Sequence, residues 1–150
     1  MSTGRFAGTP SVPTSSSSPN LALLILRFAG ALPVLYHGSA ILFGAYGGPG
    51  PQGFAAYQHL PVIYGYLVGL AQFAGGLAIL LGVFQRIGAI CLIIVMVGAI
   101  YRVHLSLGYD VNKGGMEFAL TVLLISLGLL ISGPGAYSLS GILPGPLKKL

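Results

Sequence analysis

Four long apolar runs follow one another along the chain after position 20, and they constrain the fold more than any other feature of the sequence. A segment that crosses about 30 Å of hydrocarbon needs roughly 20 mostly apolar residues, and we expect such spans at about 21–45, 62–84, 87–104 and 115–131. Only 6% of the residues are charged, whereas an ordinary soluble domain has about 25%. The sequence therefore predicts an all-α membrane protein, a four-transmembrane-helix antiparallel bundle in a lipid bilayer.

The segments outside the spans are too short for a second domain. Residues 1–20 are rich in Ser, Thr, Pro and Gly and have few apolar side chains, so we expect a disordered tail. The apolar run that begins at Leu21 is longer than the hydrophobic region of a secretory signal peptide, which favours a signal anchor. We assign 21–139 to the membrane domain and 140–150 to a short basic tail.

The connections between the spans predict which helices are neighbours. Residues 53–61 form a partly apolar connection, which we expect to be a loop along the membrane interface. Gln85 and Arg86 make a turn so short that the second and third spans must be antiparallel neighbours. In the second span Gly65 and Gly69 are spaced to let another helix approach closely.

The distribution of charge predicts the orientation of the bundle, because short cytoplasmic loops carry an excess of Lys and Arg. Four basic residues share one side: Arg5, Arg86, Lys148 and Lys149. Lys113 lies on the opposite side, where every tyrosine except Tyr137 falls near a loop or a helix end, as is typical of an interfacial aromatic belt. We therefore predict that the N and C termini are cytoplasmic.

Polar residues from three spans are expected at one depth near the outer end of the bundle: His37, His104 and Glu117. Ionisable groups inside lipid are costly, so each is a candidate functional residue. Gln72 lies deeper, where it either holds helices together by a hydrogen bond or contacts a ligand. Arg102 and His104 are about 200° apart on a helix, so both cannot point into the bundle. We place His104 inward and Arg102 toward the lipid headgroups or the edge of the bundle, with Glu117 able to pair with either.

Each of these residues also has a structural interpretation. The histidines could instead be interfacial residues that hydrogen-bond to backbone or to Glu117. Glu117 stands at a helix start, where the positive end of the helix dipole would stabilise it. Arg27 is interpreted as an anchor that reaches the inner headgroups. Cys91, the only cysteine, is assigned to core packing, so the chain can form no internal disulfide or redox pair.

Several kinds of site are not expected. Three histidines and two carboxylates without helical ligand pairs predict no metal site. A haem between His37 and His104 is disfavoured, because the Gly and Ala content of the spans favours close helix contact. The net charge of +5 comes from a few scattered basic residues, so nucleic acid is not an expected partner. No covalently bound cofactor is expected.

Several short motifs, in their order and spacing over about 21–139, resemble the DoxX family of small four-span bacterial membrane proteins. These motifs are Leu26-Arg27, Tyr36-His37-Gly38, Gln72-Phe73-Ala74-Gly75-Gly76, Val103-His104 and Gly114-Gly115-Met116-Glu117. The resemblance implies a multi-pass protein of the bacterial inner membrane and an association with redox chemistry, as in the DoxD-type subunit of a thiosulfate:quinone oxidoreductase. Gln72 and Ile41 depart from the pattern, since a glutamate and a lysine are common at these positions.

The leading functional hypothesis is the membrane subunit of a quinone-linked oxidoreductase or of a redox or thiol-stress complex. A quinone would bind near four polar residues: His37, Gln72, His104 and Glu117. Quinone reduction needs hydrogen-bond donors and a proton route, which His and Glu supply, and a redox protein partner would supply the electrons. The alternative is a non-catalytic membrane anchor or assembly scaffold. A small transporter would require a homo-oligomer, because four spans enclose a narrow interior.

Overall fold

The computed structural model describes residues 17–145 and 147, and these residues form helices and connecting turns without a β-strand. Most of the tail predicted for 1–20 lies outside the described residues, as do Arg5, Lys148 and Lys149, which were used to predict the orientation. Residues 17–20 are described, and they already belong to the first helix.

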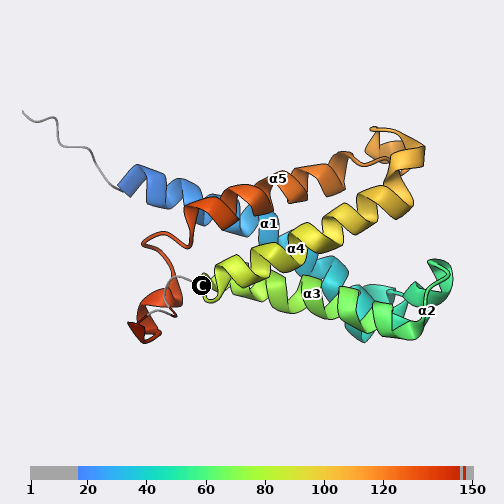
Figure 1. Ribbon diagram of the computed structural model, residues 1–150, viewed down its shortest axis with the longest axis horizontal. Helices are drawn as coiled ribbons and strands as arrows, with labels where there is room; N and C mark the ends of the chain where they lie inside the picture. Colours follow the sequence, from blue (N-terminus) through green and yellow to red (C-terminus); the bar gives the residue numbers. More distant parts are fainter. Residues whose placement is uncertain (1–16, 146, 148–150) are drawn as a thin grey trace, which may run out of the picture.

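Five α-helices follow one another: α1 (Ser17–Phe43), α2 (Gly50–Tyr57), α3 (Val62–Leu81), α4 (Gln85–Ala99) and α5 (Glu117–Ser132) (Figure 1). Three helical segments are long and apolar enough to cross a membrane, namely α1, α3 and α4 with its continuation to Leu107. The 16 residues of α5 are also apolar, but a helix of that length spans only about 24 Å. The fold is therefore an all-helical membrane bundle with three full-length spans and one shorter apolar helix.

The turn between α3 and α4 lies slightly earlier than the sequence predicts. Gly82 ends α3 with φ +67°, a left-handed conformation that glycine adopts without steric cost, and its N–H donates to the carbonyls of Ala78 and Ile79. Phe84 then also takes a positive φ. Gln85 and Arg86 consequently lie in the first turn of α4 and do not form the turn themselves. The antiparallel arrangement of the two helices is as predicted (Figure 1).

The connection predicted as an interfacial loop at 53–61 is helical over its first half. Pro51 stands at the start of α2, where its fixed φ suits a helix and its missing N–H is not needed. Pro51 and Ala55 are buried, and the Cα of Gly65 lies so close to the Pro51 carbonyl that a Cβ there would overlap it. Packing on α3 thus stabilises a short helix that its length alone would not predict.

The helices form a ring in which α3 packs on α1 and α4, and α5 packs on α4 and, less extensively, on α1. Glycines allow the close crossings. A Cβ on Gly38 of α1 would lie 2.6 Å from the backbone N of Phe73, and one on Gly88 of α4 would lie 2.7 Å from the Gly75 carbonyl oxygen. The buried core between the helices includes Val34, Ile79 and Leu92.

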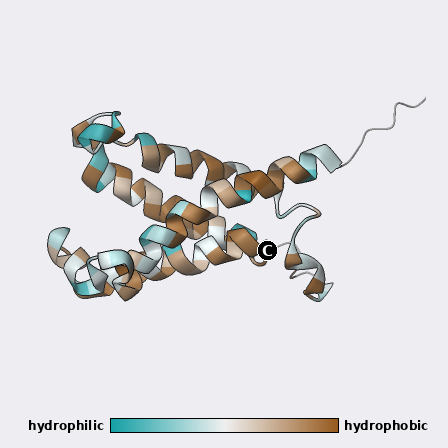
Figure 2. Cartoon of the chain, turned by 180° about the vertical axis from the view of Figure 1, so that it is seen from behind, coloured by the Kyte–Doolittle hydropathy of each residue, from teal (hydrophilic) through white to brown (hydrophobic). Residues whose placement is uncertain are grey.

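The two ends of the bundle differ in character. The end that carries the α3–α4 turn is called the hairpin end below, and the end that carries α2 and residues 105–116 is called the loop end. From the hairpin end, α3 and α4 diverge toward the loop end (Figure 1). Figure 2 shows hydrophobic residues along the helices and hydrophilic residues gathered at the loop end.

Candidate functional site

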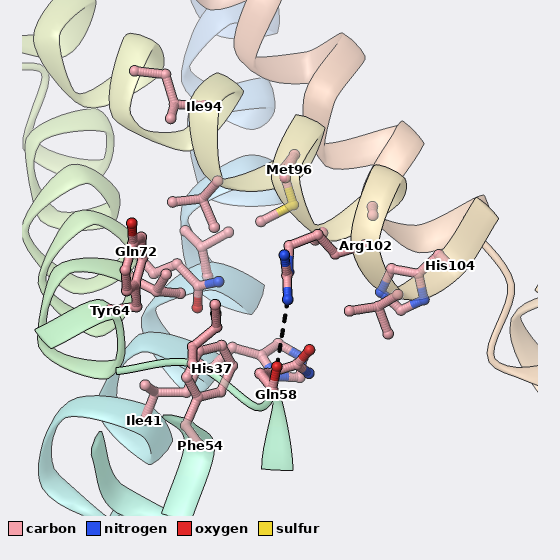
Figure 3. A pocket seen from close by; sticks show the side chains of 18 of the residues that line it. His37, Ile41, Phe54, Gln58, Tyr64, Gln72, Ile94, Met96, Arg102 and His104 are labelled. Atoms are coloured by element: carbon pink, nitrogen blue, oxygen red, sulfur yellow. Dashed lines mark hydrogen bonds between the residues drawn. The ribbon is translucent and has the colours of Figure 1, made fainter. Parts of the chain in front are cut away.

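A cavity of about 580 Å³ lies between the diverging parts of α3 and α4 at the loop end, with α1, α2 and α5 completing its walls (Figure 3). Its volume falls within the 300–1,000 Å³ typical of small-molecule sites. The lining is mainly apolar, with six polar or ionisable side chains among it: His37, Gln58, Tyr64, Gln72, Arg102 and His104. A few polar groups on an apolar wall are the usual composition of a ligand site.

Gln72 is the most deeply buried of these polar side chains. It comes from the middle of α3, is only 7% exposed, and reaches toward the cavity (Figure 3). Its Oε1 atom is buried and has no hydrogen-bond partner among the described residues. Leaving a buried acceptor unpaired costs about 1–3 kcal/mol. The Gln72 side chain makes no hydrogen bond to another helix within the described residues, and it lines the cavity, so it is positioned to contact a ligand there.

The end of α4 changes its helical form beside the cavity. Ile100–His104 is a π-helical turn, a rare conformation that is frequent at functional sites. Arg102 and His104 both line the cavity, although an ideal α-helix would point them in opposite directions. Arg102 is an exposed residue that also lines the cavity. Its long side chain crosses the cavity, and Nη2 donates to the Gln58 carbonyl oxygen at 3.5 Å (Figure 3).

His104 has a defined tautomer in this setting. Its Nδ1 lies 2.6 Å from the Gly114 carbonyl oxygen. A carbonyl oxygen can only accept a hydrogen bond, so Nδ1 carries a hydrogen and donates it. Nε2 is the nitrogen left for a ligand, as an acceptor when the ring is neutral and as a donor when it is protonated.

His37 reaches the cavity from α1. Its ring packs against two aromatic rings, with centroid distances of 5.7 Å to Phe118 of α5 and 5.5 Å to Tyr36. It makes no hydrogen bond within the part of the chain that the structure describes. Both ring nitrogens therefore remain for a ligand or for water.

Glu117 is the predicted site residue that does not line the cavity. Its Oε2 accepts a hydrogen bond from the Val111 backbone N at 3.2 Å, so the carboxylate faces the loop before α5.

Two polar residues that line the cavity, Gln58 and Tyr64, were not predicted from the sequence. The spacing of four residues between Tyr64, Val68 and Gln72 places all three toward one helix face and could have indicated Tyr64. Gln58 follows a short helix and had no such signal.

Arg27 lies at the opposite, hairpin end, and its side chain is only 2% exposed. Its Nε and Nη2 donate to the carbonyls of Ile79 and Leu80 at 2.8 and 2.6 Å, and its Nη1 donates to those of Pro134 and Tyr137 at 3.2 and 2.6 Å. This buried position differs from the expected one, in which the Arg27 side chain reaches the lipid headgroups. The carbonyls in the last turn of α3 carry the negative end of the helix dipole, which attracts the guanidinium inward.

Three apolar helices of membrane-spanning length around a lined cavity define a multi-pass helical membrane protein. The chain belongs to the DoxX family, because the sequence pattern of that family matches residues 22–105, more than half of the chain. The matched segment includes His37, Gln72, Arg102 and His104 and stops before Glu117. Neither a curated protein nor a solved structure gives a match to the chain.

Proposed function

We propose that this DoxX-family protein is the membrane subunit of a quinone-linked redox complex and that its cavity binds the ring of a lipid-soluble quinone. The Gln72 amide at the inner wall of a mainly apolar cavity is the observation that carries this proposal. A quinone presents two carbonyl acceptors and a quinol presents two hydroxyl donors. The Gln72 amide can donate from Nε2 to a quinone carbonyl, and the neutral His104 ring can accept at Nε2 from a quinol hydroxyl.

His104 is the residue we assign to proton transfer. Reduction of a quinone to a quinol takes up two electrons and two protons. With Nδ1–H held by the Gly114 carbonyl, Nε2 can take a proton from the solvent and give it to a quinone oxygen as the ring is reduced. A second cycle delivers the second proton. Electrons would come from a redox protein partner, since the single cysteine, Cys91, cannot act as a dithiol.

We further propose that α5 completes a fourth crossing and that the loop end lies at the outer leaflet of a bacterial inner membrane, with cytoplasmic termini. Local thinning of the bilayer can accommodate a short helix. Arg86 at the hairpin end supports this orientation. Seven exposed tyrosines agree with an outer interfacial belt: Tyr36, Tyr46, Tyr57, Tyr64, Tyr66, Tyr101 and Tyr109.

Gln72→Leu tests the proposed site. We expect it to weaken binding of decylubiquinone by about tenfold, the effect of losing one hydrogen bond of about 1.4 kcal/mol. Stability should be unchanged or slightly raised, because the substitution removes an unpaired buried oxygen. Equilibrium binding to protein in lipid nanodiscs measures the affinity, and thermal unfolding measures the stability.

Gln85→Leu is the matched control. Gln85 is also buried with an unpaired Oε1, but it lies at the hairpin end and its Nε2 donates to the Leu129 carbonyl at 3.0 Å. We expect this variant to lose about 1 kcal/mol of stability and to keep its quinone affinity. A wild-type protein that does not bind decylubiquinone would refute the quinone proposal. Lower stability with unchanged affinity in Gln72→Leu would support the scaffold alternative.

Glu117→Gln should leave quinone affinity unchanged, because the carboxylate faces the Val111 backbone and does not line the cavity. Its loss from the N-terminus of α5 should lower stability by about 0.3–1 kcal/mol. The same binding and unfolding measurements check both expectations. A tenfold loss of affinity at equal stability would show instead that Glu117 belongs to the quinone-binding site.

A further inference from the structure

The wall of the cavity between α3 and α4 contains residues that also face the outside of the bundle. Ile94 of α4 lines the cavity although it is 67% exposed, and Tyr64 of α3 lines it although it is also exposed. An exposed side chain that also lines the cavity lies at the rim of an opening, and the exposed lining residues His37 and Arg102 mark the rim nearer the loop end. The cavity is therefore open sideways, through the gap between these two helices.

Backbone geometry explains why the gap exists. The two helices touch at Gly75 and Gly88 near the hairpin end and diverge from there (Figure 1). One turn after Ile94, Gly98 has no side chain to fill the space. A Cβ on Gly98 would meet nothing within 4 Å, and Gly98 also lines the cavity.

The opening lies within the membrane-spanning parts of both helices. Val68, Ile94 and Gly98 line it without a charge, so it suits a hydrocarbon chain. Tyr64 is the polar side chain at this opening. Arg102 reaches Gln58 across the loop side of the cavity (Figure 3), and Gln72 lies at the inner wall. The opening is thus apolar except for Tyr64, and further polar groups lie at the inner wall and on the loop side of the cavity.

We propose that the gap between α3 and α4 is a lateral portal through which the ligand enters from the bilayer and in which its hydrocarbon tail remains. Gly98 keeps the portal open. The ligand class is an amphipathic lipid with a polar ring, and its identification as a quinone rests on the function proposed above. The ring lies at Gln72 and His104, and the tail leaves past Gly98 and Ile94.

Gly98→Leu tests the portal with two probes, decylubiquinone and the tail-less ubiquinone-0, measured in nanodiscs. Leucine should lower the affinity for decylubiquinone by about tenfold or more, because its side chain occupies the space of the tail. The affinity for ubiquinone-0 should remain unchanged. Gly98→Ala should give a smaller loss for the tailed probe. The new side chains meet open space, so both variants should fold.

Gly128→Leu is the matched control. Gly128 of α5 is an exposed helical glycine; as at Gly98, a Cβ there would meet nothing within 4 Å, but Gly128 does not line the cavity. We expect unchanged affinity for both probes. Equal affinity of wild type and Gly98→Leu for decylubiquinone would overturn the portal, as would an equal loss for both probes. Absence of binding by the wild type would instead overturn the quinone function.

Discussion

Replacing Arg27 with leucine is expected to lower the free energy of unfolding by at least about 3 kcal/mol, the largest effect we expect of any single substitution in the chain. The guanidinium donates to four backbone carbonyls. Two belong to the last turn of α3, and two belong to the segment after α5. Leucine would remove the guanidinium donors: the Ile79 carbonyl would keep the bond from the Gly82 N–H, and the other three carbonyls would lose their side-chain donor.

The measurement is unfolding in mixed micelles of dodecylmaltoside and SDS, followed by far-UV circular dichroism. Arg27→Lys should recover only part of the loss, because an ammonium group cannot reach acceptors in several directions as the guanidinium fork does. Arg86→Leu is the control, since Arg86 is exposed at the same end of the bundle. A change in unfolding free energy below about 1 kcal/mol in Arg27→Leu would contradict this and favour the position expected from the sequence, with Arg27 at the lipid headgroups.

Gly38→Ala is expected to lower stability by about 2–3 kcal/mol, through overpacking at the crossing of α1 and α3. The new Cβ would lie 2.6 Å from the Phe73 backbone N and 3.0 Å from the backbone C and the Cβ of Gln72. Backbone atoms cannot rotate away, so the two helices must separate. Because Gln72 is at the contact, we also expect weaker decylubiquinone binding.

The same unfolding and binding measurements apply to Gly38→Ala. Gly128→Ala is its control, because it adds a methyl group to a helical glycine in open space. That control should be neutral or stabilising by up to about 1 kcal/mol, the difference in helix propensity. If Gly38→Ala behaved like Gly128→Ala, α1 and α3 would not be in the close contact described above.

Part of the candidate site could be predicted from the sequence. The positions of His37 and His104 near the ends of apolar runs followed from counting residues along helices of fixed rise. That Arg102 and His104 line the same cavity could not be predicted. It depends on a π-helical turn and on the long Arg102 side chain, which reaches across to Gln58. Glu117 was assigned to the site from its position along the helix, which does not specify the direction of its carboxylate; that direction is set by the hydrogen bond from the Val111 backbone N–H.

The sequence by itself determined the helical membrane class, the antiparallel pairing of α3 with α4 and the family, because apolar run length, turn length and motif spacing are local properties of the chain. Only the tertiary structure decided that Arg27 turns inward, that Gln72 has an unpaired oxygen beside a cavity, and that Gly98 opens that cavity to the side. The physical reason is that the partner of a buried polar group is a backbone or side-chain atom of another helix. Its position depends on how the helices pack, which no local pattern specifies.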